Sequence, residues 1–179
     1  MRHVLTCHPD TPCTAASGIA VEVERPAPAQ LLLRYRIGGV NDRWVSPSPF
    51  PAVRTDGLWR HTCFEAFVRP LPGEAYRELN FATGAWASYR FDSYRAGMAD
   101  ADIGAPDIHI SGPGGGIFDM LVIWDLDLPG DAEWRVGVSM VVEETGGRMS
   151  YWALAHPPGK PDFHHADCFA LQLPPPDRP

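Results

Sequence analysis

Seven side chains that could take part in chemistry lie close together near the C-terminal end of the sequence. The segment HPPGKPDFHHADC contains His156, Lys160, Asp162, His164, His165, Asp167 and Cys168. Imidazoles, carboxylates and thiols bind transition metals, transfer protons or attack as nucleophiles. The same groups also bind ligands at the rim of a pocket, or simply form a polar turn. The rest of the sequence must decide between these possibilities.

The spacing of these residues indicates neither a metal centre nor a nucleophilic enzyme. No HExxH or paired CxxC motif occurs, and in an extended segment the adjacent His164 and His165 point to opposite sides. Cys168 opens an apolar run, where cysteine usually acts as a small core residue. GxSxG and Walker motifs are absent, and no GK[ST] follows the glycine-rich run at 111–116. Acidic residues are plentiful, but a glycosidase pair is defined by a distance that the sequence does not give.

The double proline at 157–158 predicts an ordered loop between two strands. Consecutive prolines remove the donors of a strand ladder and reduce the freedom of the unfolded chain. Lys160, Asp162 and His164 alternate along the extended run that follows, so they can share one side. We therefore expect a rigid loop that forms one wall of a ligand pocket, with ion pairs that are partly structural. A metal site is the alternative.

The elements that must hold this loop are predicted to be strands. Apolar and polar residues alternate with a period of two in 19–23, 31–37, 64–68, 117–128, 134–144, 149–154 and 168–173. A hairpin over 76–91 adds two more strands. The prediction is an all-β fold: an antiparallel β-sandwich of immunoglobulin-like or jelly-roll-like two-sheet architecture, with eight to ten strands and little helix. A short helix is expected only over 93–103.

The hairpin over 76–91 predicts a polar sheet face. A three-residue loop at 83–85 sets Glu78 opposite Arg90 and Asn80 opposite Ser88, and it avoids setting Arg77 against Arg90. One face would then carry Glu78, Asn80, Trp86, Ser88 and Arg90. Glu65 likewise points away from the apolar face of its own strand. Such a face suits a hydroxyl-rich ligand, and a solvated outer face is the alternative.

Six tryptophans are many for a chain of 179 residues. Trp124 and Trp134 fall on apolar strand faces and are expected in the core. Trp59 lies in the polar segment RTDGLWRHT, Trp86 falls on the polar hairpin face, and Trp152 has the opposite parity to Tyr151. Tryptophans in such places suit stacking against a sugar ring, although Trp59 could also plug one end of the sandwich.

The overall composition excludes some partners. With a net charge of −7 and scattered arginines, the chain lacks the basic patch that nucleic acid binding needs. No apolar run approaches the roughly 20 residues that span a membrane, and no signal peptide is evident. We expect a cytoplasmic protein whose four cysteines are free thiols, with one domain over 1–173 and a disordered proline-rich tail over 174–179.

Three segments together resemble a known superfamily. They are LWRHTCFEAFVRP, YRELNFATGAWASYRFDSYRAGM and SYWALAHPPGKPDFHHADCFALQL, which lie between Leu58 and Leu173. They resemble DOMON-like ligand-binding domains of the short bacterial stand-alone type, a superfamily that includes the family 9 carbohydrate-binding modules. The resemblance implies a non-catalytic domain that binds sugars or haem. It implies ligand contacts at the matching positions, which are Trp59, Arg60, Glu65, Asn80 and Arg90.

The predicted function is non-catalytic binding of a small ligand, a carbohydrate above all, without a cofactor. The predicted site residues are Trp59, Arg60, Glu65, Asn80, Trp86, Arg90, Trp152, His156, Lys160, Asp162 and His164. Haem is the alternative ligand, although no Met and His pair aligns with the axial ligands of haem-binding DOMON domains. A protein-interaction module or a subunit of an enzyme complex is a further alternative. An enzyme would instead place a metal or a perturbed carboxylate pair in the pocket.

Overall fold

Strands dominate the regular structure of this protein, and they pair in antiparallel fashion. The computed structural model describes residues 1–46, 53–114 and 116–176. Its strands are β1 (Arg2–Cys7), β2 (Gly18–Ala27), β3 (Gln30–Gly38), β4 (Cys63–Pro70), β5 (Tyr76–Phe81), β6 (Trp86–Phe91), β7 (Ala99–Asp100), β8 (Asp107–Gly114), β9 (Ile117–Asp125), β10 (Trp134–Glu143), β11 (Met149–Ala153) and β12 (Leu171–Leu173). Two single-turn 3-10 helices, η1 (Leu58–Arg60) and η2 (Ala166–Cys168), complete the list. The predicted all-β, antiparallel fold is confirmed.

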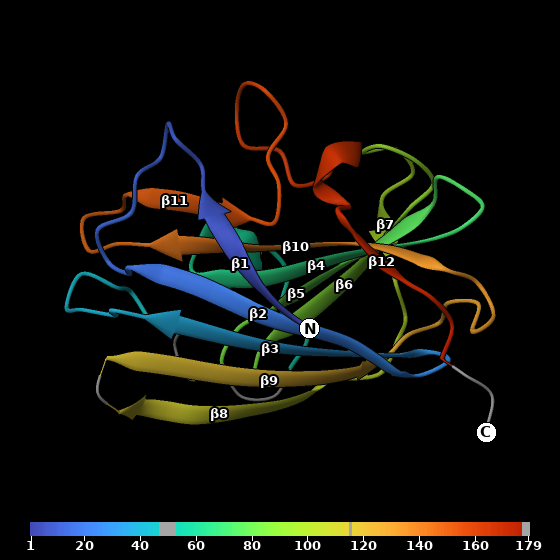
Figure 1. Cartoon of the computed structure of the whole chain (residues 1–179), viewed down its shortest axis with the longest axis horizontal. Helices are drawn as coiled ribbons and strands as arrows, with labels where there is room; N and C mark the ends of the chain where they lie inside the picture. The colour runs from blue at the N-terminus through green and yellow to red at the C-terminus, as the bar shows by residue number, and fades with distance from the viewer. Residues whose placement is uncertain (47–52, 115, 177–179) are drawn as a thin grey trace.

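The strands form two halves of one curled sheet, which lie across the core from each other (Figure 1). One half has the order β1-β2-β3-β9-β8, and the other has the order β7-β6-β5-β4-β10-β11-β1. β1 belongs to both halves, because residues 2–5 pair with β2 whereas Thr6 and Cys7 pair with β11. β12 pairs with the first residues of β10. A strand that passes between sheets makes a corner, so the arrangement is compatible with a sandwich joined along one side.

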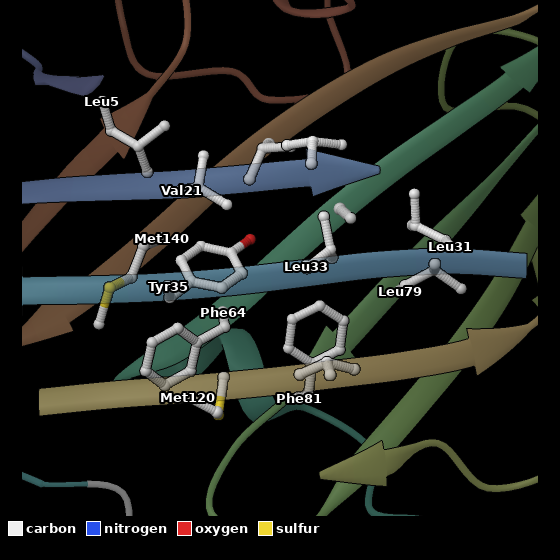
Figure 2. Packing of buried hydrophobic residues seen from close by; sticks show 14 of the residues in the cluster. Leu5, Val21, Leu31, Leu33, Tyr35, Phe64, Leu79, Phe81, Met120 and Met140 are labelled. Atoms are coloured by element: carbon white, nitrogen blue, oxygen red, sulfur yellow. The ribbon is translucent and has the colours of Figure 1, made fainter. Parts of the chain in front are cut away.

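The space between the halves is filled by the residues of each strand that point inward (Figure 2). Tyr35 of β3 packs edge-on against Phe64 of β4, with ring centroids 5.1 Å apart. The Tyr35 hydroxyl donates a hydrogen bond to the backbone carbonyl of Glu65 at 2.8 Å. Phe81 of β5 packs in the same way against Trp124 of β9 at 6.0 Å. These contacts hold the halves together and leave the other face of β4, β5 and β6 available for a site.

Nine of the strands lie in the segments predicted from alternation, and three do not. β1 fully buries only Leu5, β7 has two residues, and β8 is an edge strand, so none shows an apolar stripe. The helix expected over 93–103 is wrong, because the chain turns at Ser93–Ala96 and then enters β7. Residues 174–176 have no regular secondary structure and 177–179 lie outside the described residues, so the disordered tail over 174–179 stays a prediction.

Arg25, near the end of β2, connects the turn between β2 and β3 to the loop before β10. Its buried guanidinium donates hydrogen bonds to the carbonyls of Pro28 at 2.6 Å, Gly130 at 2.8 Å and Ala132 at 2.6 Å. The same group lies over the ring of Trp134, 3.6 Å from the centroid. One side chain thus satisfies several carbonyls and covers an aromatic ring at once.

Glu144 should give the fold an acid-sensitive contribution. Its carboxylate accepts hydrogen bonds from the backbone N–H and hydroxyl of Thr14 at 2.7 and 2.6 Å, and from Arg148 at 2.6 Å. Burial opposes ionisation, but these donors hold the pKa of Glu144 at about 2, below its ordinary 4.5. The stabilisation is therefore present above pH 4.5 and is lost as the pH falls toward 2.

At pH 7 we expect the free energy of unfolding of Glu144→Gln to be about 1–2 kcal/mol lower than that of the wild type. The two values should become equal near pH 2. Urea denaturation over this pH range measures it. The exposed Glu24→Gln is the matched control and should follow the wild-type curve. A deficit of Glu144→Gln that does not change with pH would contradict the assignment.

Candidate ligand-binding site

A pocket of about 360 Å³ opens on the outer face of the half that contains β4, β5, β6, β10 and β11. Its lining residues are Trp59, Glu65, Phe67, Glu78, Phe91, Arg95, Met98, Val141, Tyr151, Pro161, Asp162, Phe163 and His164. Strand residues that point away from the core form the floor. Three loops supply the walls, so the pocket depends on segments that are far apart in the sequence.

The outer face of the floor is covered, although a face of an antiparallel sheet is often solvated. β4 buries six residues in succession from Cys63 to Val68, where one wet face would give alternation. On the outer side Phe67 contacts the rings of His164 and Phe169, with centroid distances of 5.1 and 6.2 Å. The segment that follows β11 therefore lies on this sheet as an additional layer.

Two of the walls come from the loop before β4 and the loop after β6. Trp59 lies in η1 with 36% of its surface exposed, and its ring packs edge-on against Tyr89 at 5.7 Å. Arg95 and Met98 lie in the loop between β6 and β7. Arg95 has a left-handed backbone conformation (φ 53°), which costs roughly 1 kcal/mol for a residue with a side chain. Such a cost is retained where the surroundings fix the side chain.

Asp162 fixes the third wall, which is formed by residues 161–164. Its carboxylate accepts hydrogen bonds from the Tyr94 hydroxyl at 2.5 Å, from Arg95 at 2.7 Å and from the backbone N–H of His164 at 3.1 Å. Burial opposes ionisation, but the Tyr94 and Arg95 donors lower the pKa of Asp162. The ionised carboxylate therefore joins two walls of the pocket.

His164 is held as a neutral imidazole in the pocket. Burial is the main cause that lowers its pKa to about 4, and the nearby Arg95 guanidinium contributes. Its Nδ1 lies 2.8 Å from the Tyr76 hydroxyl, and its Nε2 lies 3.7 Å from a carboxylate oxygen of Glu78. If Tyr76 donates to Nδ1, the Nε2–H faces Glu78. The imidazole then positions a carboxyl group without neutralising it.

Two glutamates on the pocket floor have raised pKa values. Burial, and next the neighbouring Glu78, raise the pKa of Glu65 well above its ordinary 4.5. Burial also raises the pKa of Glu78, although Asn80 and Arg95 oppose this. The Asn80 amide donates to Glu78 Oε1 at 2.8 Å. The floor thus holds two carboxyl groups, and burial favours the protonated form of each.

Several polar atoms of this floor lack the partners that buried groups normally have. Glu65 is 2% exposed, and the Ser139 hydroxyl reaches its Oε2 at 3.4 Å. No hydrogen bond from the described residues reaches its Oε1, and the weakly donating Cys63 thiol lies near this carboxyl group. The carbonyl oxygen of the Asn80 side chain also has no partner. Buried acceptors of this kind are satisfied when a ligand brings donors.

Four predicted site residues line this pocket together, as the sequence suggested. They are Trp59, Glu65, Asp162 and His164. Glu65 points away from the core, as its parity predicted. Asn80 lies directly opposite Glu65 in the β4–β5 ladder and is fully buried. That these residues bind a ligand stays a prediction.

The register predicted for the hairpin is wrong. Phe81 pairs with Trp86, and Arg77 pairs with Arg90, so the turn has four residues and is closed by a hydrogen bond from Ala82 N–H to the Ala85 carbonyl at 2.9 Å. The shift places Trp86 and Arg90 on the face opposite Glu78 and Asn80. Trp86 packs against Trp124 of the core at 5.6 Å, so neither residue lies in this pocket.

Four other predicted residues also lie elsewhere. Trp152 is buried in the core between the halves, because Tyr151 is the residue of β11 that faces outward. His156 lies at a separate surface hollow, where its Nε2–H donates to the Thr6 carbonyl at 2.8 Å. Lys160 and Arg60 are exposed and do not line the pocket.

Sequence reasoning missed several lining residues. They are Phe67, Glu78, Phe91, Arg95, Met98, Val141, Tyr151, Pro161 and Phe163. Phe67 and Phe91 are apolar residues at positions assigned to polar or core faces. The available signal was the nearly continuous apolar run CFEAFV over 63–68, which is typical of a strand with both faces covered, and all six residues are buried in the structure.

The thiols do not favour nucleophilic chemistry. All four cysteines are free, as predicted. Cys168 is buried, and its thiol donates to the carbonyls of Ala155 and Asp162 at 3.2 Å each. The thiol thus connects the two ends and the middle of the segment 155–168. Burial raises the pKa of Cys168 to about 12. Among the described residues no cluster of His, Cys, Asp and Glu could hold a metal ion, and no helix could cross a membrane.

The fold and the pocket define an antiparallel, curled β-sheet protein with a partly aromatic cavity on its outer face. A solved structure with this fold is that of a protein from Bacteroides uniformis ATCC 8492 described as a "putative carbohydrate-binding protein". The match has a TM-score of 0.67 and covers 97% of this chain and 85% of that chain, at 12% identity. No family model matches the sequence, and no curated protein matches it significantly. The relation to DOMON-like domains stays a prediction.

Proposed function

We propose that this protein binds a carbohydrate in the pocket between Trp59 and residues 161–164, without changing it chemically. One observation carries the proposal: an aromatic-lined cavity has on its floor the buried Glu65, one carboxyl oxygen of which lacks a partner among the described residues, and the unpartnered side-chain carbonyl of Asn80 belongs to the residue opposite Glu65 in the ladder. Sugars match this combination, since their C–H faces pack on rings while their hydroxyls donate to acceptors. The half-exposed ring of Trp59 provides a stacking surface at the rim.

Two comparisons support the proposal. The similar solved structure is of a protein described as a "putative carbohydrate-binding protein", and at 12% identity the likeness concerns the fold alone. The resemblance to DOMON-like domains and family 9 carbohydrate-binding modules covers the segments that supply Trp59, Glu65 and residues 161–164.

Replacing Trp59 by alanine should weaken sugar binding about tenfold, because one stacking contact contributes on the order of 1–1.5 kcal/mol. The experiment is a thermal-shift screen of mono- and oligosaccharides, followed by calorimetry on each hit. Lys160→Ala is the matched control, since Lys160 is exposed and does not line the pocket, and it should bind as the wild type does. A sugar that binds Trp59→Ala as tightly as it binds the wild type would place the site elsewhere. A screen without hits would contradict the proposal.

The pair Glu65 and Glu78 favours a second candidate, hydrolysis of a glycosidic bond. Two carboxyl groups in one pocket are the arrangement from which a glycosidase takes its acid and its nucleophile or base. The test is release of product from chromogenic glycosides by the wild type and by Glu78→Gln. Product release by the wild type that is lost in Glu78→Gln would show that the protein is a catalyst and would contradict binding without chemical change. A Soret band in the purified protein would instead indicate haem.

A further inference from the structure

The acidic groups of the pocket outnumber its cations. Three carboxyl groups line it, those of Glu65, Glu78 and Asp162, and Arg95 is the single arginine or lysine among the lining residues. The Arg95 guanidinium is bound to Asp162 at 2.7 Å, and His164 is neutral. Among the ion pairs of the described residues, none joins an arginine or lysine to Glu65 or Glu78. The floor therefore has room for one more positive charge.

The rings around the floor also suit a cation. Phe67 and Phe91 lie on the floor, and Trp59 and Tyr151 lie beside it. The face of an aromatic ring attracts a cation, and most strongly where water is excluded. Glu65 adds a buried, under-paired oxygen to this surface. A carboxylate pair within an aromatic wall is the surrounding that an ammonium group requires.

We propose that the pocket selects sugars that carry a protonated amino group, which binds between Glu65 and Glu78. The proposal rests on the sugar-binding function above and names its ligand class. A uronic acid or sugar phosphate would add a negative charge to a floor without a free cation, and a neutral sugar would offer the carboxyl pair hydroxyl donors but no charge. An amino sugar supplies both the charge and three N–H donors.

Binding of an ammonium group should release a proton. In the empty pocket burial favours the protonated form of Glu65, and a bound cation favours the carboxylate form. The groups that face the pair are Cys63, Tyr35, Tyr76, His164, Arg95 and Asp162. The affinity should therefore rise with pH for as long as the amine stays protonated. A raised folded pKa also means that the empty protein loses stability as the pH rises through it, and the amino sugar should remove that loss.

The experiment compares glucose, N-acetylglucosamine and glucosamine by calorimetry, in two buffers with different ionisation enthalpies. We expect glucosamine to bind at least tenfold more tightly than the two neutral sugars, with a proton released. Glu65→Gln should abolish this preference, and the exposed Glu24→Gln should retain it. Because glutamine has the same shape as the acid, circular dichroism and thermal melts of both variants verify the fold.

The outcomes separate this inference from the function on which it rests. Equal binding of the three sugars, or tighter binding of glucuronic acid, would overturn the amine preference and leave sugar binding intact. Binding of propylamine without any sugar would overturn sugar binding. A preference for glucosamine that survives Glu65→Gln would overturn the assigned position of the ammonium group.

Discussion

Replacing Arg25 by alanine is expected to lower the free energy of unfolding by about 3–5 kcal/mol. The substitution removes charged hydrogen bonds to the carbonyls of Pro28, Gly130 and Ala132, and it exposes the ring of Trp134. Pro28 is exposed but Gly130 and Ala132 are half-buried, so their carbonyls lose a charged donor that water replaces only in part. Urea denaturation at neutral pH measures the loss.

Two further variants test the reason for this loss. Arg25→Lys keeps the charge but cannot span several carbonyls or lie flat on the ring, so it should recover less than half of the stability. The exposed Arg60→Ala is the matched control and should change the free energy of unfolding by less than about 0.5 kcal/mol. Full recovery in Arg25→Lys would show that charge alone matters.

Replacing Asp162 by alanine should destabilise the protein by about 2–4 kcal/mol and loosen the wall formed by residues 161–164. It removes the hydrogen bonds from Tyr94, Arg95 and the His164 backbone at the junction of two walls. Because the carboxylate pKa is lowered in the folded protein, its contribution should fade as the pH falls below the ordinary pKa of aspartate. Hydrogen exchange of 155–168 should accelerate, and affinity for the bound sugar should fall at least tenfold.

Asp167→Ala is the matched control for this segment. Asp167 is exposed and pairs only with the exposed ring of His165, at 3.5 Å. We expect wild-type exchange and affinity in this variant. Faster exchange at 93–98 but not at 155–168 in Asp162→Ala would show that Asp162 supports the Arg95 loop alone.

Alternation of apolar and polar residues predicted the strands that bury one face and expose the other. It failed for strands that are covered on both faces. Leu31, Leu33, Tyr35 and Ile37 point to the core as their spacing indicated. The hairpin register was wrong because the apolar residues of both strands were placed on one face, whereas Leu79 and Phe81 pack in the core and Tyr89 and Phe91 pack on the outer side. The predicted register also avoided placing Arg77 opposite Arg90. In the structure Arg77 instead forms two hydrogen bonds with Asp127, at 2.9 and 2.8 Å, which offset the repulsion. No local pattern reveals a partner fifty positions away.

The site was predictable where a residue was unusual for its position. Glu65 in an apolar strand, Trp59 in a polar loop and Asp162 beside a double proline each drew attention, and all three line the pocket. Phe67 and Tyr151 looked like ordinary strand residues. Their role became visible only with the layer that covers the sheet, and that layer is a tertiary feature.

That covering layer also sets an order of events during synthesis. The floor strands β4, β5 and β6 emerge from the ribosome long before Phe163 and Phe169, which cover Tyr76 and Phe67. Until then a growing chain carries an exposed aromatic surface on its outer side, where chaperones or other nascent chains can attach. The same late segment forms the last wall of the pocket. A chain that can bind its ligand has therefore already covered the aromatic outer face of β4, β5 and β6.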